Sequence, residues 1–390
     1  MSSTPIFNAA DAAILSQRNL MKPAIGKRRK ISSSIVSSDS SSSSGDSEGS
    51  GFRQDHFLIV PEMLESEETL QYLGWGADKA TNIWRRWVSV TADDTDVARY
   101  TMYEFGFLEF ALEAVPSSEL EDGQEAWTTH MLGWGVAAEL VDAIMDTQFA
   151  DVRGTESAQY WVRDTMSIRY LGLEGLKKAS ILRDELRQNP AGSFRGNIAV
   201  ATTTARPSNV PGNLVLYKAI SKDRIEKDEN GKIIYSSIVS STPSDFRGYG
   251  GTLLYFTPDI EVAKIYRQYI KKRGEFPPVM LQLTLSNAFV ESLPPQILLF
   301  EDLWKQIIYT CRSRKNLKRD LSGFHKYPLI IAPISRSPND TISRLRDCGQ
   351  LSENYVLQVN GKKAIQYAFQ GEDVLTQLEE EEGELKVMVD

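Results

Sequence analysis

Two tyrosines in the C-terminal half of this 390-residue chain are the side chains best placed to bind a flat ring. Between Gly248 and Tyr266 the sequence predicts a glycine turn, a short apolar strand that contains Tyr255, and a helix that begins at Pro258. The helix carries Tyr266 eleven residues after Tyr255. A strand and the helix that follows it can present both rings to one cleft, so we expect the pair to stack a heterocycle.

Two polar side chains on other predicted strands of this half complete the set of candidates. Lys218 follows Leu216 and Tyr217 on the first strand, and Gln366 lies on the last. A lysine ammonium donates hydrogen bonds and a glutamine amide accepts them, so either group can bind a hydroxyl. The common catalytic signatures are missing, because the sequence has no Walker-type phosphate loop, no Gly-x-Ser-x-Gly motif and no Cys-x-x-Cys pair.

Three motifs follow one another along the chain: Leu216-Tyr217-Lys218, the segment from Gly248 to Tyr266, and the last strand with Gln366. In this order they resemble the ADP-ribosyltransferase fold, in particular its His-Tyr-Glu branch, which includes diphtheria-type toxins and the poly(ADP-ribose) polymerases. The resemblance covers residues 214 to 378 and is most specific in its middle third. It implies that NAD is the substrate and that the two tyrosines sandwich its nicotinamide ring. The residues implied to bind NAD are Lys218, Gly248, Gly250, Tyr255 and Tyr266, and those implied to be catalytic are Gln366 and Lys218.

Lys218 and Gln366 depart from the family pattern. Lys218 stands where the family has His or Arg, and Gln366 stands where it has Glu. Cleavage of the bond to nicotinamide builds positive charge on the ribose, which a carboxylate stabilises and a neutral amide does not. A carboxylate introduced by Gln366→Glu is therefore expected to strengthen the chemistry. A shift in the alignment would instead place the carboxylate of Glu353, Glu372 or Asp373 at the position of the family's glutamate.

Two functions remain open at this point. Some family members without the glutamate still transfer single ADP-ribose units, so the resemblance implies such transfer to an unknown protein acceptor, with release of nicotinamide. The alternative is a non-catalytic interaction protein with a degenerate ADP-ribosyltransferase fold. A carboxylate pointing into the cleft would favour the enzyme, and a cleft filled by its own side chains would favour the interaction protein.

The hydrophobic pattern of the C-terminal half predicts an α+β domain over residues 213–378, because short β-prone runs outnumber helices there. Under the resemblance this domain is a split β-sheet. Strands are predicted at 214–220, 232–240, 252–257, 279–285, 328–334, 355–359 and 364–369, and helices at 259–272 and 299–311.

A tryptophan-rich helical domain is predicted over residues 55–188, where the periodicity is helical and six of the seven tryptophans occur. A Leu-Gly-Trp-Gly motif recurs at Gly74 and Gly133, each before a helical stretch, and a weaker copy is centred on Gly172. The unequal spacing argues against a solenoid. The tryptophans are either core residues, the usual role of aromatic side chains at helical spacing, or anchors for a partner protein.

Residues 1–54 are predicted to be a disordered tail, because they contain few large apolar residues and a long serine-rich acidic tract. The basic run at residues 27–30, near Lys22, is either a nuclear-import signal beside phosphorylatable serines or an incidental charge cluster. A linker rich in Pro, Gly, Thr and Ser is expected at 189–212, and a solvated acidic tail at 379–390.

The composition narrows the remaining classes of function. A formal net charge of −8 argues against broad nucleic-acid binding by the whole chain. No apolar stretch approaches the roughly 20 residues of a membrane span, and the first residues lack a secretory-signal pattern. Two cysteines cannot form a disulfide framework, and three scattered histidines offer little for a metal site. The expected location is intracellular, either nuclear or cytoplasmic.

Overall fold

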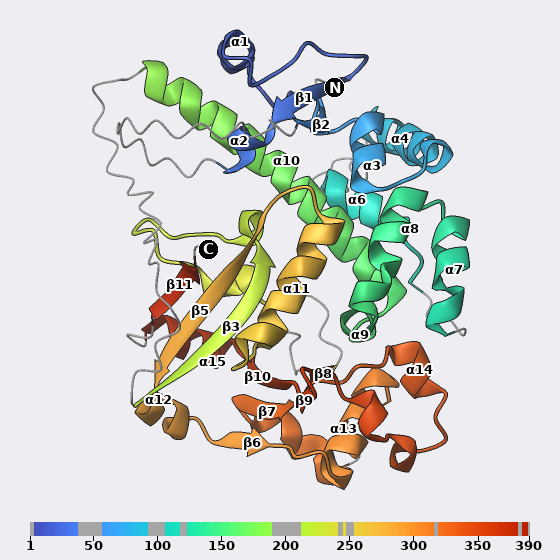
Figure 1. The fold of residues 1–390 in the computed structure, drawn as a ribbon, viewed down its shortest axis with the longest axis vertical. Helices are drawn as coiled ribbons and strands as arrows, with labels where there is room; N and C mark the ends of the chain where they lie inside the picture. Colours follow the sequence, from blue (N-terminus) through green and yellow to red (C-terminus); the bar gives the residue numbers. More distant parts are fainter. Residues whose placement is uncertain are drawn as a thin grey trace.

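The computed structural model describes residues 4–37, 57–92, 106–117, 123–188, 212–240, 245–246, 253–315, 319–380 and 384–388. Helices dominate the N-terminal half and several small sheets occupy the C-terminal half, so the chain is a mixed α+β protein (Figure 1). None of the described helices is long and apolar enough to span a membrane.

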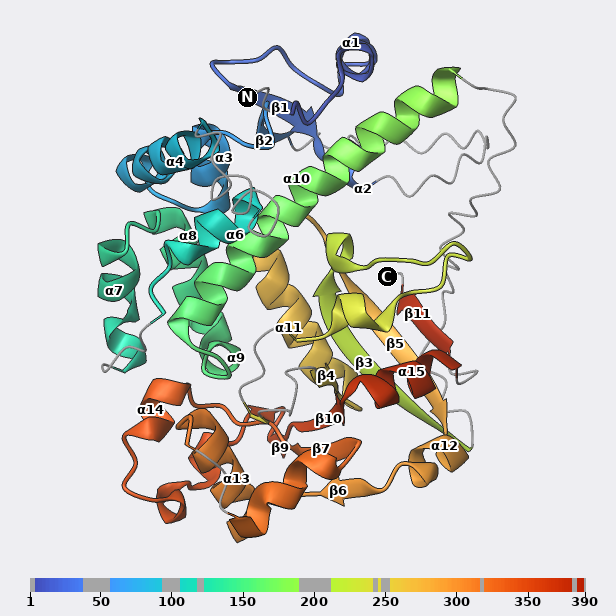
Figure 2. The same ribbon diagram turned by 180° about the vertical axis from the view of Figure 1, so that it is seen from behind.

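One long helix, α10, separates the two halves. It runs over Ala158–Gln188 and crosses the molecule between the N-terminal elements and the C-terminal sheets (Figure 1 and Figure 2). The shorter helices of this region are α3 Glu67–Leu73, α4 Ala77–Ala92, α6 Phe107–Glu113, α7 Trp127–Gly133, α8 Ala138–Met145 and α9 Ala150–Arg153. One core buries Trp87 of α4, Trp127 of α7, Trp161 of α10 and Trp75, which lies between α3 and α4. This burial confirms the core role for these four tryptophans.

The two Gly-Trp-Gly motifs form turns that pair with each other. The Gly76 N–H donates to the Gly135 carbonyl at 2.8 Å, and the Ala137 N–H donates to the Gly74 carbonyl at 2.8 Å. Gly74 and Gly135 have φ angles of 122° and 86°, a conformation that residues with a Cβ rarely adopt. The repeated motif therefore reflects two matched turns, one before α4 and one before α8.

The third copy of the motif does not precede a helix, because Gly172 lies inside α10. The prediction of a helix start at this position is wrong. A Cβ on Gly172 would lie 2.0 Å from Cδ2 of Phe276, a ring that follows the C-terminal helix α11. The glycine is needed because an aromatic ring packs directly against the backbone of α10.

The N-terminal segment is folded, so the prediction of a disordered tail is wrong for residues 4–37. Ile6, Leu15, Met21 and Ile31 are each at most 5% exposed, and this burial offsets the ordering entropy. These apolar residues follow no simple period, which is why the sequence pattern did not reveal them. The elements are α1 Ala9–Gln17, β1 Arg28–Ser32 and α2 Ser33–Ser37, and β1 pairs antiparallel with β2 Phe57–Pro61.

The basic run at residues 27–30 coincides with the beginning of β1 and is not part of a free tail. Arg29 pairs with Glu62 at 2.7 Å, and Lys27 pairs with Glu68 at 3.4 Å. The import role stays a prediction, and the serine tract that follows residue 37 lies outside the described residues.

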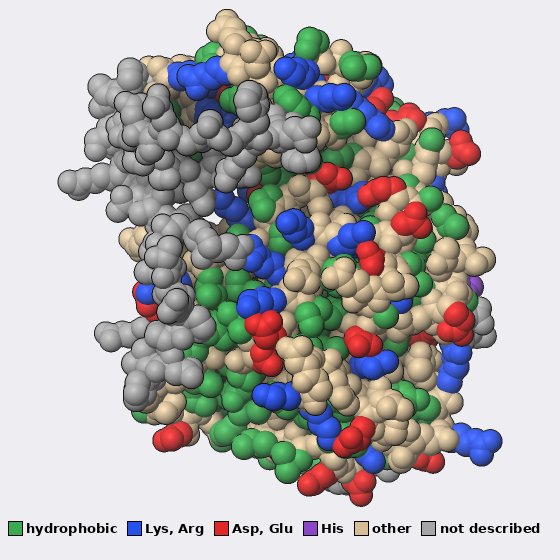
Figure 3. Space-filling view, in the orientation of Figure 1, with side chains coloured by type: hydrophobic (Ala, Val, Ile, Leu, Met, Phe, Trp, Pro, Cys, Tyr) green, Lys and Arg blue, Asp and Glu red, His purple; other side chains and the backbone are tan. Residues whose placement is uncertain are grey.

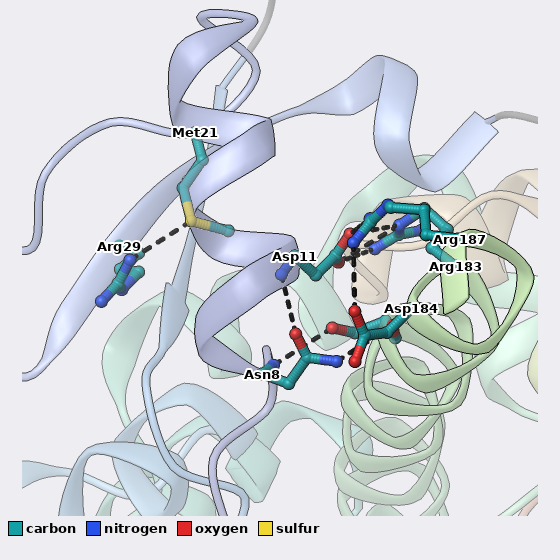
Figure 4. A network of polar contacts seen from close by, with 8 residues as sticks. Asn8, Asp11, Met21, Arg29, Arg183, Asp184 and Arg187 are labelled. Carbon is teal, nitrogen blue, oxygen red and sulfur yellow. Dashed lines mark hydrogen bonds and ion pairs between the residues drawn. The ribbon is translucent and has the colours of Figure 1, made fainter.

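A buried carboxylate holds α1 against α10 (Figure 4). Asp11 is fully buried and accepts hydrogen bonds from Arg183, at 2.7 Å, and from Arg187. Asn8 caps α1 by accepting from the Asp11 N–H at 2.7 Å, and its own N–H donates to Ser180 Oγ at 3.2 Å. Burial raises the pKa of Asp11, but hydrogen bonds from Arg183, Ser180 and Arg187 outweigh it and lower the pKa overall. The carboxylate is therefore charged at neutral pH and anchors the N-terminal segment.

Three small sheets lie in the described C-terminal half, with strand orders β11-β5-β3, β4-β10-β7-β6 and β8-β9. The two larger sheets meet where Tyr217 and Thr257 exchange backbone hydrogen bonds of 2.7 and 2.9 Å. The strands are β3 Asn213–Ser221, β4 Leu253–Phe256, β5 Pro278–Ser286, β6 Pro295–Ile297, β7 Leu329–Pro333, β8 Gln358–Val359, β9 Lys362–Lys363, β10 Ile365–Gln370 and β11 Glu384–Met388. The helices are α11 Ile260–Arg273, α12 Asn287–Ser292, α13 Asp302–Arg312, α14 Asn339–Ser343 and α15 Glu372–Glu380.

Three predictions for this half are wrong. Residues 232–240 do not form a strand, and Tyr235–Ile238 is a 3-10 helix instead. The strand expected at 355–359 is reduced to Gln358–Val359, after a 3-10 helix at Glu353–Tyr355. Residues 379–390 are not a solvated tail throughout, because α15 extends to Glu380 and β11 pairs antiparallel with β5. Leu385 and Val387 of β11 pack on the core of the sheet, which explains the pairing. The expected linker at 189–212 lies outside the described residues except for its last glycine.

The helical region and the C-terminal half share one apolar core. Tyr269 of α11 and Phe276 belong to the same buried cluster as Trp161 of α10. The Tyr269 ring stacks on Phe149 with centroids 5.0 Å apart, and the Arg273 guanidinium lies 4.6 Å from the Trp161 ring centroid. The boundary between the two regions is therefore a packed interface.

Acidic and basic side chains are interspersed over the described part of the face in Figure 3. That face does not offer the broad basic surface that non-specific nucleic-acid binding uses.

We expect Gly172→Ala to lower the free energy of unfolding by about 1–3 kcal/mol, because the new methyl group overlaps the Phe276 ring. Gly133→Ala is the matched control, since a Cβ there meets no atom within 4 Å. Urea unfolding of both variants tests the difference. Equal stabilities would show that α10 and Phe276 do not approach each other this closely.

Candidate functional site

A cavity of about 190 Å³ lies at the junction of the helical region and the two C-terminal sheets. It is lined by α10, β3, β4, α11 and β10, elements that converge in the middle of the molecule (Figure 2). Ligand sites often lie where two packed regions meet, so the location itself is informative.

Four of the six residues predicted for the NAD site line this one cavity. Lys218 comes from β3, Tyr255 from β4, Tyr266 from α11 and Gln366 from β10. The other two predicted residues, Gly248 and Gly250, lie outside the described residues.

The sheet register explains how three of these side chains meet. Backbone pairing of Tyr217 with Thr257 sets Lys218 beside the end of β4. Ala368 of β10 is opposite Tyr255, and Gln366 lies two residues before it. Because side chains alternate along a strand, Gln366 and Ala368 project to the same face of the sheet.

The rings of Tyr255 and Tyr266 pack against different groups of side chains. The Tyr255 ring packs near-parallel to Phe246, with centroids 6.5 Å apart and 29° between the ring planes. Tyr266 packs on the apolar cluster that contains Val262 and Ile334, and its hydroxyl lies 3.4 Å from Thr155 Oγ1. Burial raises the pKa of both phenols, so both rings are uncharged at neutral pH.

Lys218 carries its amine in a poorly solvated position. The Nζ atom donates to the Tyr255 carbonyl at 3.3 Å. Burial and, to a lesser extent, Arg224 lower the pKa of Lys218 to about 8, against the opposing effect of Asp164. A hydrogen-bond donor that can also lose its proton near neutral pH is thus present in the cavity.

Gln366 belongs to a buried network around an ion pair. Asp245 accepts from Arg312 Nε at 2.6 Å, from Gln366 Nε2 at 2.6 Å and from the Ser335 N–H at 2.9 Å. Arg312 also donates to the Thr155 carbonyl at 2.8 Å. The Asp245 and Arg312 side chains are 5% and 1% exposed, so solvent does not screen this pair.

A second ion-pair network forms the α10 wall of the cavity. Asp164 bonds to Arg224 at 2.9 Å and to Arg273 at 2.8 Å. Burial raises the pKa of Asp164, but the two arginines outweigh this effect and lower the pKa overall. Arg273 lies over the rings of Trp161 and Tyr269, at 4.6 and 4.4 Å from their centroids. This wall therefore contains three charged side chains joined through Asp164, with two aromatic rings packed against Arg273.

Apart from Gln366, sequence reasoning missed the residues of both networks. Asp245 lies just before the glycine-rich turn, and Arg312 ends α13, but neither belongs to a local motif. The carboxylates offered by a shifted alignment are not at the cavity. Glu353 is exposed and pairs with Lys363 at 2.6 Å, whereas Glu372 and Asp373 begin α15.

The described residues contain no group of three His, Cys, Asp or Glu side chains that could hold a metal ion. The sequence matches no protein-family model and no curated protein, and the fold matches no solved structure.

Replacing Arg312 by Met leaves the Asp245 carboxylate buried without its cation. We expect a loss of about 3–5 kcal/mol in the free energy of unfolding. The control is Arg336→Met, which removes a surface pair with Asp151 of 3.2 Å and should cost less than about 1 kcal/mol. Chemical denaturation checks both values, and similar small losses would contradict the buried geometry.

Proposed function

We propose that the chain is an ADP-ribosyltransferase-like protein that binds NAD at this cavity, with the nicotinamide ring between Tyr255 and Tyr266. One observation carries the proposal. Lys218, Tyr255, Tyr266 and Gln366 come from three strands and one helix, and they line the same cavity.

The dimensions of the cavity support a one-ring ligand. A cavity of about 150 Å³ holds benzene in another protein, and the cavity here measures about 190 Å³. A nicotinamide ring fits this space, so the nucleotide part of NAD must extend beyond it. Uncharged tyrosine rings suit stacking on the ring, and Lys218 can donate to a ribose hydroxyl.

The strand arrangement also supports the finer fold assignment. Two small sheets joined by the backbone pairing of Tyr217 with Thr257, with the cavity beside that contact, fit a split-sheet domain. We therefore retain the split β-sheet of the ADP-ribosyltransferase-like fold as part of the proposal.

Transfer of ADP-ribose to a protein acceptor is the second step of the proposal. Asp245 is the carboxylate beside Gln366, and Arg312, Ser335 and Gln366 all donate to it. Its negative charge is thus largely offset, and it offers less stabilisation to a cationic ribose than an unpaired carboxylate would. We propose NAD binding as the main function and expect nicotinamide release to be slow.

A non-catalytic interaction protein is the second candidate. The observation that favours it is that Asp245 and Asp164 are both ion-paired within the chain. In that case the cavity is a structural feature, and NAD has no specific site.

The test of NAD binding is a calorimetric titration of the full chain and of two variants of Tyr266. We expect saturable binding to the parent chain and about tenfold or greater weakening for Tyr266→Ala, because one stacking face is lost. Tyr266→Phe keeps the ring and loses only the 3.4 Å contact with Thr155, so it should bind like the parent. No saturable binding by the parent, or equal behaviour of both variants, would favour the interaction protein.

The geometry reverses the expectation for Gln366→Glu. Gln366 Nε2 lies 2.6 Å from Asp245 Oδ2, so a glutamate there meets a second carboxylate, and the two must share a proton. We expect the single variant to be destabilised, with no gain in NAD hydrolysis.

Combining Gln366→Glu with Asp245→Asn keeps one carboxylate in the buried network and restores the amide–carboxylate hydrogen bond between the two positions. The double variant should recover stability and, if the cavity is catalytic, hydrolyse NAD faster than the parent. Thermal unfolding and nicotinamide release measure the two effects. A large rate gain in the single variant would contradict the contact between residues 366 and 245.

A further inference from the structure

Within the described part of the chain, the cavity holds an amine that contacts no counter-ion. Of the described residues that line the cavity, Lys218 is the one lysine. Its polar contact within the described chain is the neutral Tyr255 carbonyl, at 3.3 Å. Asp164, the acidic residue that acts on it, is already bonded to Arg224 and Arg273. The ammonium form of Lys218 is thus poorly compensated.

The charged and titratable groups around Lys218 come from several of the elements that line the cavity. The acidic residues are Glu156, Asp164 and Asp245, the basic residues are Arg224, Arg273 and Arg312, and the phenols are Tyr160, Tyr217, Tyr255 and Tyr266. Burial is the largest cause that lowers the pKa of Lys218 from 10.5 to about 8, and Arg224 adds to it. At pH 7 such a lysine holds roughly 300-fold more free amine than one of pKa 10.5.

We propose that Lys218 is a nucleophilic amine that captures small one-ring aldehydes in this cavity as imines. The Nζ lone pair adds to the carbonyl carbon, and a C=N bond replaces the C=O bond. The carbonyl oxygen leaves as water with the two protons of the amine, so the step is redox-neutral and needs no co-reactant. The cavity volume and the two tyrosine rings select a flat aromatic aldehyde over a bulky one.

This activity goes beyond NAD binding. In the NAD site the protonated form of Lys218 donates a hydrogen bond, whereas imine formation requires the free amine and no nucleotide. The two reactions share a cavity, so an aldehyde and nicotinamide should compete for it.

The experiment treats the full chain with pyridine-3-carboxaldehyde and cyanoborohydride, which reduces each imine to a stable amine. Peptide mass spectrometry then gives the labelling rate of every lysine. We expect Lys218 to react about tenfold or more faster than Lys264, an exposed lysine of α11, at pH 7. The rate at Lys218 should rise with pH to a midpoint near 8, and nicotinamide should slow it.

Two variants complete the test. Lys218→Arg should remove the fast site, and Lys264→Arg should leave labelling of Lys218 unchanged. If Lys218→Arg fails to fold, the site-resolved rates of the parent chain still decide. Labelling of Lys218 no faster than of exposed lysines, or with their pH profile, overturns the inference.

Parallel NAD titration separates this inference from the proposed function. Saturable NAD binding without fast labelling overturns the imine chemistry alone. Fast labelling without NAD binding supports the imine chemistry and overturns the NAD site.

Discussion

The buried ion pair between Asp245 and Arg312 is the interaction on which the cavity depends. Arg312 joins α13 to the Thr155 carbonyl just before α10, and Asp245 joins Arg312 to Gln366 of β10. One pair of charges therefore fixes the helical region, a helix and a sheet relative to one another. Removing two charges from water costs several kcal/mol, so such a pair is favourable only when its hydrogen bonds are well satisfied. The hydrogen bonds to Asp245 meet that condition. The pair therefore contributes more to the geometry of the cavity than to the stability of the fold.

The second constraint is the packing of α10 against α11. Arg273 at the end of α11 is bonded to Asp164 and Thr165 of α10 and lies against Trp161. A glycine at position 172 then lets Phe276 approach the helix backbone. These contacts place the side chains of α10 over the cavity, so the helical region forms one wall of the candidate site.

The sequence predicted the elements that carry the site because each has local signals. The strand at 214–220 is Asn213–Ser221, and the helix at 259–272 is Ile260–Arg273. The partners of the site follow from long-range packing, which no local pattern encodes. Gln366 and Asp245 lie 121 residues apart, and Asp11 and Arg183 lie 172 apart. The same reason explains the error at residues 4–37, since that segment is ordered by docking on α10 and not by its own propensity.

The charge balance of the cavity links its two proposed activities. Its described lining holds three acidic residues, Glu156, Asp164 and Asp245, and four basic ones, Lys218, Arg224, Arg273 and Arg312. The three arginines match the three acidic residues in number, so the proton on Lys218 sets the net formal charge of this lining. Protonated Lys218 adds a positive charge to the lining, which favours a ligand that carries negative charge. Above its pKa the same side chain is neutral and nucleophilic. Protonated Lys218 thus favours a negatively charged ligand, and deprotonated Lys218 favours an aldehyde. Both forms occur near neutral pH because burial and Arg224 together lower the pKa of this amine.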